Sequence, residues 1–318
     1  MGTSPAAIRS GPTLAILAGL SLSHLPNDLA HSLLPAIYPL LKSRFALDFG
    51  QIGLITSVFQ VTAAILLPVA ELYSERRPLP FSPVVGIASL LAGQQLLAVA
   101  PAYGLLPTAA GLVGFGSAIF HPEASRVARL AAGSRYGLAQ SMFQVGGNAG
   151  TALGPLLAAF VVVLHGQGSV AWFSLAALAG MAVLTGGGRW YRRRFAAVQR
   201  LAASTGPAGG SLSRTRVGLT ISVLLALIFP ASFYVASFSS YYTFYLINRV
   251  GVPVAQSQVL LFVVLGLVAA GTILGGPIGH RLGRKPVIWG SILGVLPSPW
   301  RCPMSVSPGR WCSPSRSG

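Results

Sequence analysis

The chain of 318 residues is apolar and strongly basic: 53% of its residues are hydrophobic, only 8% are charged, and its net charge is +17. With five acidic residues and a mean hydropathy of +0.68, it has too little polar surface to cover a soluble globular domain. Its arginines occur in short clusters between apolar segments and form no single patch. The composition therefore indicates a membrane protein and argues against a nucleic-acid-binding one.

Eight apolar segments are long enough to cross a bilayer, because a helix of about 20 residues spans the hydrocarbon. We therefore predict an all-α polytopic membrane protein. The first segment is too long for the apolar region of a secretory signal, so we expect it to be retained. The expected spans are 14–41, 50–71, 81–101, 104–122, 137–164, 168–188, 217–247 and 256–279, with a ninth beginning near 286.

Basic residues alternate between the loops that connect these spans. Fifteen Lys and Arg residues lie in the second, fourth, sixth and eighth loops, and three lie in the others. The positive-inside rule then places the N-terminus and the even-numbered loops in the cytoplasm of a bacterial inner membrane. Both cysteines, Cys302 and Cys312, lie in the final tail and say little about the redox compartment.

The first span contains an acidic residue where the bilayer makes a charge costly. Asp28 lies near its centre, and helical spacing places His24 and His31 on the same face. A carboxylate one helical turn from a histidine can hold and pass a proton, so these three residues predict a proton or substrate pathway. The alternative is a packing or capping pair at a kink made by Pro26 and Pro35.

Four ionisable residues, His121, Glu123, Arg126 and Arg129, end the fourth span within "SAIFHPEASRVARL". Glu123 and Arg126 can pair if the helix continues past Pro122, and the arginines can attract an anion. We predict a cytoplasmic gate or substrate-entry network here. A positive-inside anchor with a paired glutamate is the alternative, and it leaves His121 and Glu123 unexplained.

The fifth span has a polar face, because Gln140, Gln144 and Asn148 recur every four residues. These side chains both donate and accept hydrogen bonds, so Gln144 and Asn148 are candidates for lining a substrate pathway. The alternative is ordinary hydrogen bonding between helices, at about 0.6 kcal/mol per contact.

One face of the seventh span is aromatic. Tyr234, Phe238, Tyr241 and Tyr245 share this face. We include Tyr241 and Tyr245 among the candidate pathway residues. Packing or an aromatic belt at the membrane interface is the alternative.

The chain divides into four expected parts. Residues 1–188 form a six-helix bundle, 189–216 a basic linker that contains the Gly/Ser-rich "STGPAGGSLS", and 217–295 a partial second bundle. The remaining residues, 296–318, are rich in Pro, Ser and Arg and predict no helix. Because the ninth span keeps only about ten apolar residues, too few to cross, we expect this tail to be an out-of-frame product and the second bundle to be truncated. A truncated second bundle would leave this chain defective in transport.

A repeat relates the second loop to the eighth. "ELYSERRP" aligns with "GPIGHRLGRKP" at an offset of 205 residues. Two halves related in this way are the plan of many secondary transporters, which bind substrate between the halves.

The eighth loop looks like the loop motif of the major facilitator superfamily, G-x-x-x-D-R-x-G-R-[KR]. In that family the loop lies at the cytoplasmic end and helps gate alternating access, so the resemblance implies a gate role for matching residues of both loops. The matching residues are Gly276, Arg281, Gly283, Arg284 and Lys285 in the eighth loop, with Glu75 and Arg76 in the second.

Both copies of the motif depart from the family pattern. His280 occupies the aspartate position of the eighth loop, and Glu75 occupies it in the second. Glu71 stands at the glycine position of the second loop, where a small residue allows close helix approach.

The string "GGNAGTALGP" in the fifth span resembles the core of a motif found in the drug/proton antiporter branch of that superfamily. Gly150 and Gly154 lie four residues apart, which allows close helix packing, and Pro155 permits a bend. Packing alone is the alternative to an antiporter role.

Longer strings carry a more specific resemblance. "HLPNDLAHSLLPAIYPLL", "FHPEASRVARLAAGSRYGLAQSMFQVGGNAGTALGPLL" and the eighth-loop sequence resemble the fosmidomycin resistance transporters of this superfamily, from about His24 to about Val295. The resemblance implies proton-driven export of a small drug, fosmidomycin being a phosphonate antibiotic. We expect a monomer in membrane lipid that handles a small molecule and protons and needs no nucleic acid and no cofactor.

Two other functions are open from the sequence. Proton-coupled uptake of a small organic anion differs only in direction. A polytopic membrane enzyme is less well supported, because the five acidic residues are scattered and no catalytic motif is evident. His121 and Glu123 have metal-ligating side chains but no evident partners, so we expect no metal site.

Overall fold

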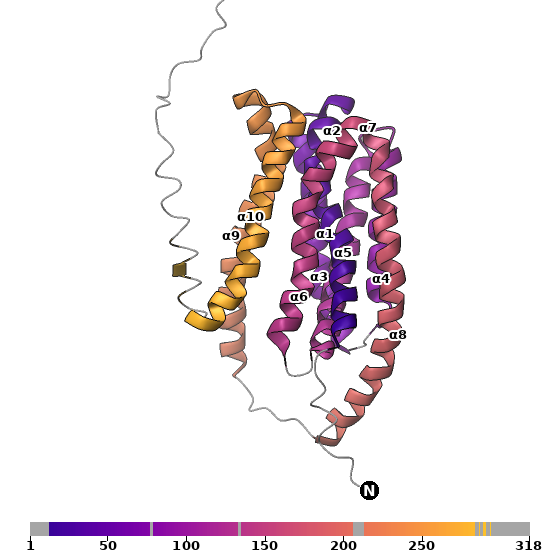
Figure 1. Ribbon diagram of the computed structural model, residues 1–318, viewed down its shortest axis with the longest axis vertical. Coiled ribbons are helices and arrows are strands. Elements are labelled where there is room, and N and C mark those ends of the chain that lie inside the picture. The colour runs from indigo at the N-terminus through magenta and orange to yellow at the C-terminus, as the bar shows by residue number, and fades with distance from the viewer. Residues whose placement is uncertain are drawn as a thin grey trace, which may run out of the picture. The chain divides into compact units, whose positions relative to one another are not determined.

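The computed structural model is helical throughout the part of the chain that it describes (Figure 1). That part comprises residues 13–76, 79–132, 135–205 and 213–283, and positions 286, 289, 290 and 293. The predicted all-α class is confirmed. Contacts divide the chain into two units between Ala270 and Gly271, and every side chain of the site below belongs to the first unit.

The helices follow the expected spans closely. Their bounds are α1 Leu14–Ala36, α2 Tyr38–Phe45, α3 Phe49–Arg76, α4 Ser82–Val99, α5 Leu105–Ala131, α6 Tyr136–Leu157, α7 Val163–His165, α8 Ser174–Thr205, α9 Arg214–Tyr245 and α10 Val254–Leu282. A π-helical turn, Ala158–Val162, joins α6 to α7, a 3₁₀ segment, Gln167–Phe173, precedes α8, and a π-helical turn, Leu246–Val250, follows α9.

Three expected spans differ from the observed helices, and one of them, 168–188, continues as α8 to Thr205. The other two differ for reasons of local geometry. The span expected at 14–41 is divided at Ile37, whose φ of −90° and ψ of 0° leave the helical region. Pro39 lies in the first turn of α2 and has no N–H to donate to the carbonyl oxygen of Pro35. The helix is therefore interrupted between the two prolines. By contrast, α5 continues through Pro122 to Ala131.

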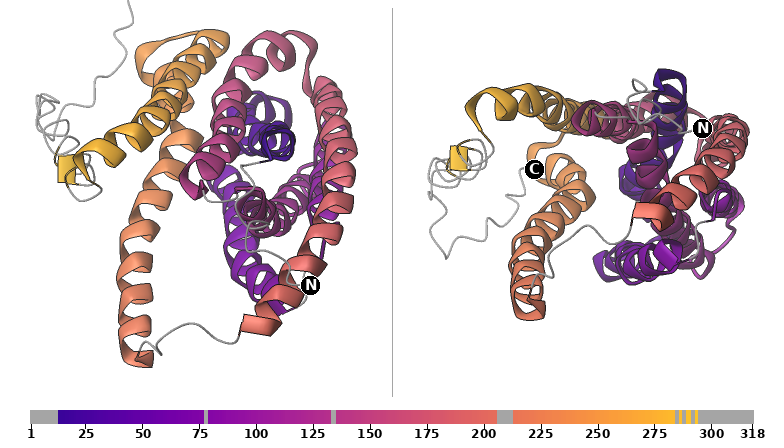
Figure 2. Two further views of the ribbon diagram at one scale, coloured as in Figure 1. Left: turned by 60° about the horizontal axis from the view of Figure 1, so that its bottom comes forward. Right: turned by 90° about the horizontal axis from the view of Figure 1, so that it is seen from below.

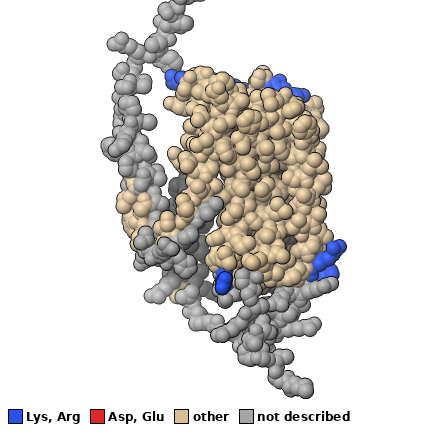
Figure 3. Space-filling view, in the orientation of Figure 1, with Lys and Arg blue, Asp and Glu red and all other residues tan. Residues whose placement is uncertain are grey.

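Among the described residues, six helical segments are long and apolar enough to cross a membrane. They are Phe49–Ser74, Ser82–Val99, Leu105–Ala131, Gly137–His165, Gln167–Arg192 and Val254–Gly271. Figure 3 supports this assignment, since the face it shows carries Lys and Arg near its two ends and a wide uncharged band between them. The chain is thus a multi-pass membrane protein.

The helix α1 is not among these six because polar side chains lower its hydropathy. Its buried residues include Ser23, His24 and Asn27. These residues are shielded because α1 packs against α5, α6 and α8 (Figure 2). A polar helix is therefore enclosed by more apolar ones.

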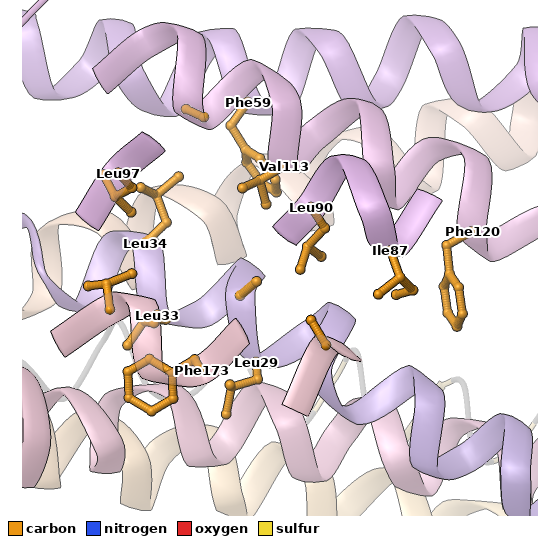
Figure 4. Packing of buried hydrophobic residues seen from close by; sticks show 14 of the residues in the cluster. Leu29, Leu33, Leu34, Phe59, Ile87, Leu90, Leu97, Val113, Phe120 and Phe173 are labelled. Carbon is orange, nitrogen blue, oxygen red and sulfur yellow. The ribbon is translucent and has the colours of Figure 1, made fainter. Parts of the chain in front are cut away.

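Apolar side chains fill the space between α1 and its neighbours. Figure 4 shows part of this core, with Leu29 and Leu33 of α1 among residues from α3, α4 and α5. The labelled members are Leu29, Leu33, Leu34, Phe59, Ile87, Leu90, Leu97, Val113, Phe120 and Phe173. This packing fixes the rotation of α1 and therefore the direction of its polar side chains.

A row of glycines brings α6 against α1. Gly146, Gly150 and Gly154 recur every four residues. A β-carbon on Gly146 or Gly150 would collide with the backbone carbonyl of Ser21 or Leu25, and one on Gly154 would collide with an α1 side chain. The two helix backbones are therefore in direct contact, as small residues allow. The antiporter interpretation of this motif stays a prediction.

We expect the substitution Gly150→Ala to destabilise the protein by about 1–3 kcal/mol, because the added methyl group overpacks the contact with α1. Gly137→Ala is the matched control on the same helix, since nothing lies within 4 Å of a β-carbon there. Thermal unfolding in detergent measures both. Equal unfolding temperatures for the two variants would contradict the close contact.

Candidate functional site: a histidine–aspartate cluster beside a polar cavity

Three ionisable side chains from α1 and α5 meet inside the helix bundle. His24 Nε2 lies 3.3 Å from Asp28 Oδ1, and His121 Nε2 lies 3.6 Å from the same oxygen. The two Nε2 atoms are 3.2 Å apart. We call these three residues the His–Asp cluster. The side chain of His24 is buried, and those of Asp28 and His121 are 17% and 31% exposed.

The sequence predicts two different sites for the members of this cluster. The spacing of His24 and Asp28 on one helix predicts their proximity, which is confirmed. The sequence predicts His121 in the cytoplasmic gate, but the structure brings its ring to Asp28. Proximity of residues 97 positions apart depends on how α1 and α5 pack, and spacing along one helix carries no such information.

Backbone carbonyls orient both imidazole rings. His24 Nδ1 lies 2.9 Å from the carbonyl oxygen of Phe143, and His121 Nδ1 lies 2.9 Å from that of Ser117. A carbonyl oxygen can only accept a hydrogen bond, so each Nδ1 carries the hydrogen and donates it. In a neutral ring the Nε2 atom is then an unprotonated acceptor. The ring of Phe143 also stacks on that of His24, with centroids 4.1 Å apart.

The neighbouring helix leaves room for these groups. A β-carbon on Gly147 of α6 would lie 2.5 Å from His24 Cε1 and 2.6 Å from Asp28 Oδ2. Asn27 donates a hydrogen bond of 2.9 Å to Asp28 Oδ1. The result is a site where two nitrogen lone pairs and a carboxylate oxygen converge, which is an arrangement that binds a cation.

His31 is not part of the cluster, although it shares the predicted face. Its ring packs edge-on against Phe59, with centroids 4.3 Å apart. Its buried Nε2 atom has no hydrogen-bond partner among the described residues. The residue lines a cavity of about 430 Å³, which we call the polar cavity.

The polar cavity is lined by α1, α2, α3, α6, α9 and α10. Its polar lining residues are His31, Ser32, Tyr38, Thr56, Gln60, Thr151, Ser239 and Ser240. A smaller cavity of about 220 Å³, which we call the side cavity, shares Thr151 and Ser239 with it and is also lined by Asn148. Both volumes are of the size that holds a small molecule or part of one.

The structure separates the predicted polar residues of α6. Asn148 lines the side cavity, and its buried Nδ2 atom has no hydrogen-bond partner within the described ranges. Gln144 is half-buried and Gln140 is exposed. Of these residues, Asn148 therefore has the position expected for a pathway residue.

The aromatic residues predicted on α9 do not line the polar cavity in the part of the chain that the structure describes. Tyr241 and Tyr245 are 38% and 60% exposed. The polar residues of α9 that line it are Ser239 and Ser240, whereas Tyr234 and Phe238 of the aromatic face line the side cavity. The signal in the sequence was the run of small hydroxyl residues between aromatic ones, which the sequence analysis did not use.

A second charged group lies further along α5. Glu123 is buried, and its Oε2 atom lies 3.9 Å from Arg126 Nε. Arg126 also donates hydrogen bonds to the carbonyl oxygen and the hydroxyl oxygen of Ser74, at 2.5 and 3.2 Å, which joins α5 to the end of α3. Tyr191 of α8 interacts with Glu123 as well. We call these residues the Glu123–Arg126 network.

The condition for this ion pair, a helix that continues past Pro122, is met. Arg129, one turn further along α5, is exposed and suits the anchoring alternative. The structure therefore divides the predicted gate residues among the His–Asp cluster, the Glu123–Arg126 network and the exposed surface.

The gate residues of the two loops are described only in part. Gly276 and Arg281 belong to α10, and Gly283 follows it with a φ of +87°, a conformation that favours glycine. The side chains of Glu75, Arg76 and Arg281, the whole of Arg284 and Lys285, nearly all of the ninth span expected from 286, and the tail at 296–318 lie outside the described residues. Their gate roles stay predictions.

Comparison with known proteins decides the family. The model of the Major Facilitator Superfamily matches residues 20–311. The chain belongs to the major facilitator superfamily. It is 50% identical over 298 residues to the fosmidomycin resistance protein of Escherichia coli (strain K12), covering 93% of this chain and 72% of that protein. It is 36% identical over 288 residues to the MFS-type transporter YfnC of Bacillus subtilis (strain 168), covering 89% and 69%.

Solved structures support the same fold. A bacterial homologue of the human lysosomal transporter Spinster matches in an inward-facing, occupied state with a TM-score of 0.62 and 16% identity, and in an unoccupied state with 0.65 and 15%. The matches cover 88% and 89% of this chain, which spans 63% and 64% of those solved chains. The predicted major facilitator fold and family are thereby confirmed, and membership of a transporter family favours transport over enzymatic catalysis.

We expect Arg126→Ala to destabilise the protein by about 3 kcal/mol, because it leaves the buried Glu123 without its charged partner. Thermal unfolding in detergent measures the loss. Arg129→Ala is the matched control, because an exposed arginine on the same helix contributes within about 0.5 kcal/mol. The double variant Glu123→Gln/Arg126→Ala should recover part of the loss, and a double variant no more stable than Arg126→Ala would contradict the pairing.

Proposed function

We propose that this protein exports fosmidomycin or a similar small drug across the bacterial inner membrane, coupled to protons. Its 50% identity to a protein named for fosmidomycin resistance supports the drug class. The structural observation that carries the proposal is the polar cavity with its adjoining side cavity, where two buried polar atoms lack partners among the described residues.

Those two atoms are His31 Nε2 and Asn148 Nδ2. An unsatisfied buried polar atom costs about 1–3 kcal/mol, so it is retained where something else supplies its hydrogen bond. His31 and Asn148 line the two cavities, so a small rotation of either side chain would bring its polar atom to a polar solute there. The amide of Asn148 offers donors to an anionic group such as a phosphonate, and the hydroxyls of Ser239 and Ser240 can donate as well.

Proton coupling is the finer part of the proposal. A carboxylate within a membrane-embedded helix bundle is costly and is typically retained in an ion pathway. Asp28 meets this description, since it lies on α1 with only 17% of its side chain exposed. We assign it, with His24, to the pathway of the coupling ion. We assign the Glu123–Arg126 network and the second and eighth loops to the cytoplasmic gate.

The remaining architecture follows from the charge pattern and the family. We propose a cytoplasmic N-terminus, a monomer surrounded by lipid, a first bundle over 1–188 and a partial second bundle over 217–295. The linker at 189–216 begins within a helix, because α8 continues to Thr205. Uptake of a small organic anion is the alternative, and the assays below distinguish it by the direction of transport.

We expect expression of this chain in a fosmidomycin-sensitive strain to raise the inhibitory concentration of fosmidomycin and to lower its accumulation in the cells. A proton uncoupler should restore accumulation, because export then loses its driving force. The comparison with cells that lack the protein requires that the protein be detected in membrane fractions. Unchanged susceptibility with the protein present would contradict export, and greater accumulation would support uptake.

We expect Asn148→Ala to reduce resistance by removing a donor at the wall of the side cavity. Gln140→Ala is the matched control, because Gln140 is an exposed amide two turns earlier on the same helix. The readout is the inhibitory concentration of fosmidomycin at equal protein levels. Equal resistance in the two variants would argue against a substrate role for the cavity.

We expect Asp28→Asn to abolish proton movement that depends on drug in inverted membrane vesicles, because the amide cannot carry the charge of the carboxylate. Drug binding to the purified variant should persist, since Asp28 is not among the residues that line the polar cavity. Wild-type proton movement in this variant would exclude Asp28 from the ion pathway.

A further inference from the structure

We propose that His24, Asp28 and His121 form a transition-metal site, best suited to Zn²⁺, with one coordination position open. Each residue offers one ligand atom, and the three atoms lie within 4.8 Å of one another. Two imidazole nitrogens and one carboxylate oxygen are a donor set found in zinc sites. The sequence predicts no metal site here, because nothing in the sequence places His121 beside Asp28.

The separations between the ligand atoms fit four-coordinate zinc. With metal–ligand distances of about 2.0–2.2 Å, a tetrahedron places neighbouring ligand atoms about 3.3–3.6 Å apart. The three separations are 3.2 Å between the two Nε2 atoms, 3.3 Å from His24 to Asp28 and 3.6 Å from His121 to Asp28. A metal ion can bind without displacement of α1 relative to α5.

The hydrogen bonds around the cluster are those of a metal site. Metal-binding histidines typically donate their other ring N–H to a carbonyl or carboxylate, which fixes the ring and directs the lone pair at the metal. His24 and His121 both do so, through Nδ1 to the carbonyl oxygens of Phe143 and Ser117. Asn27 holds the carboxylate of Asp28 in the same way.

The converging acceptors also require a positive charge. In the neutral rings, the two Nε2 lone pairs face each other at 3.2 Å and both face a carboxylate oxygen. Such an arrangement is repulsive until a cation lies between the acceptors. One proton on His121 Nε2 is shared between His24 Nε2 and Asp28 Oδ1 in a three-centre hydrogen bond, whereas a metal ion binds all three atoms directly.

The surrounding residues hold the ligands in place and leave a path by which a metal ion can enter. Phe143 stacks on the ring of His24, and Gly147 provides the space that any side chain would fill. His24 is fully buried, but His121 is 31% exposed, so the ion can enter from the side of His121. Three protein ligands leave a fourth position for water, as in zinc sites that exchange their ligands.

Bound metal would occupy the carboxylate that we assign to the coupling ion, so we expect Zn²⁺ to inhibit drug export. Metal binding itself does not depend on the proposed function, because it is measured on the resting protein. A protein that binds metal but confers no resistance would refute export alone, and one that confers resistance without binding metal would refute the metal site alone.

The test is a titration of the purified full chain, in detergent and without a histidine tag, with Co²⁺ as the probe. We expect one ion per chain, the strong visible absorption of four-coordinate Co²⁺, and its displacement by Zn²⁺. Removing outer hydrogen-bonding partners costs up to about 100-fold in metal affinity, so losing a ligand in His121→Ala or Asp28→Asn should cost at least about that much. His165→Ala is the control, because that histidine is exposed and remote in sequence.

Co²⁺ that stays six-coordinate with the wild-type chain would overturn the proposal, and this outcome needs no variant to fold. Equal affinity for the wild type and His121→Ala would overturn it as well. Loss of binding in His165→Ala together with the two cluster variants would point to unfolding or surface binding, and would also refute the assigned ligands.

Discussion

The burial of the Asp28 carboxylate in an apolar helix bundle determines much of the surrounding structure. A charge in such a place needs compensating partners. The amide of Asn27 donates a hydrogen bond to it, and the two imidazoles beside it balance its charge once they hold a proton or a metal ion. The polar helix α1 is accordingly enclosed by its neighbours, while more apolar helices such as α3 and α10 carry much of the exposed surface. The close approach of α6 through its glycines completes this enclosure.

The buried carboxylate on α1 also lies next to a second proposed site, the polar cavity. The His–Asp cluster holds converging acceptors between α1, α5 and α6, and the polar cavity begins one turn further along α1 at His31. A single helix therefore carries an ion-binding group and part of a cavity wall. Movement of α1 would couple the two sites mechanically, as the proposed coupling of drug export to protons requires.

The sequence predicted the parts of this arrangement that depend on one helix. The lengths of the apolar segments predicted where the spans lie, because a bilayer imposes a minimum length on any helix that crosses it. Spacing of four residues placed His24 beside Asp28, and spacing of three predicted the pair Glu123 and Arg126 once the helix was known to continue. Family-specific strings gave the superfamily, which is shown independently by the match over residues 20–311.

The sequence could not predict contacts that depend on the packing of separate helices. His121 reaches Asp28 because of the rotation of α5, and His31 turns away from the cluster because Phe59 packs against it. Ser239 and Ser240 of α9 line the polar cavity in place of Tyr241, while Tyr234 and Phe238 line the side cavity, and the rotation of that helix sets this division. Rotation about a helix axis is determined by the complete set of neighbours, which no local spacing contains.

Gly147 makes the His–Asp cluster sensitive to mutation from a helix that gives it no ligand and no charge. Alanine, the smallest replacement, already brings a carbon atom to 2.5 Å from the ring of His24, and every larger residue intrudes further. In a genetic screen for loss of function, this position should be recovered as often as the histidines themselves. A residue without a side chain would then mark the site as clearly as the residues that perform its chemistry.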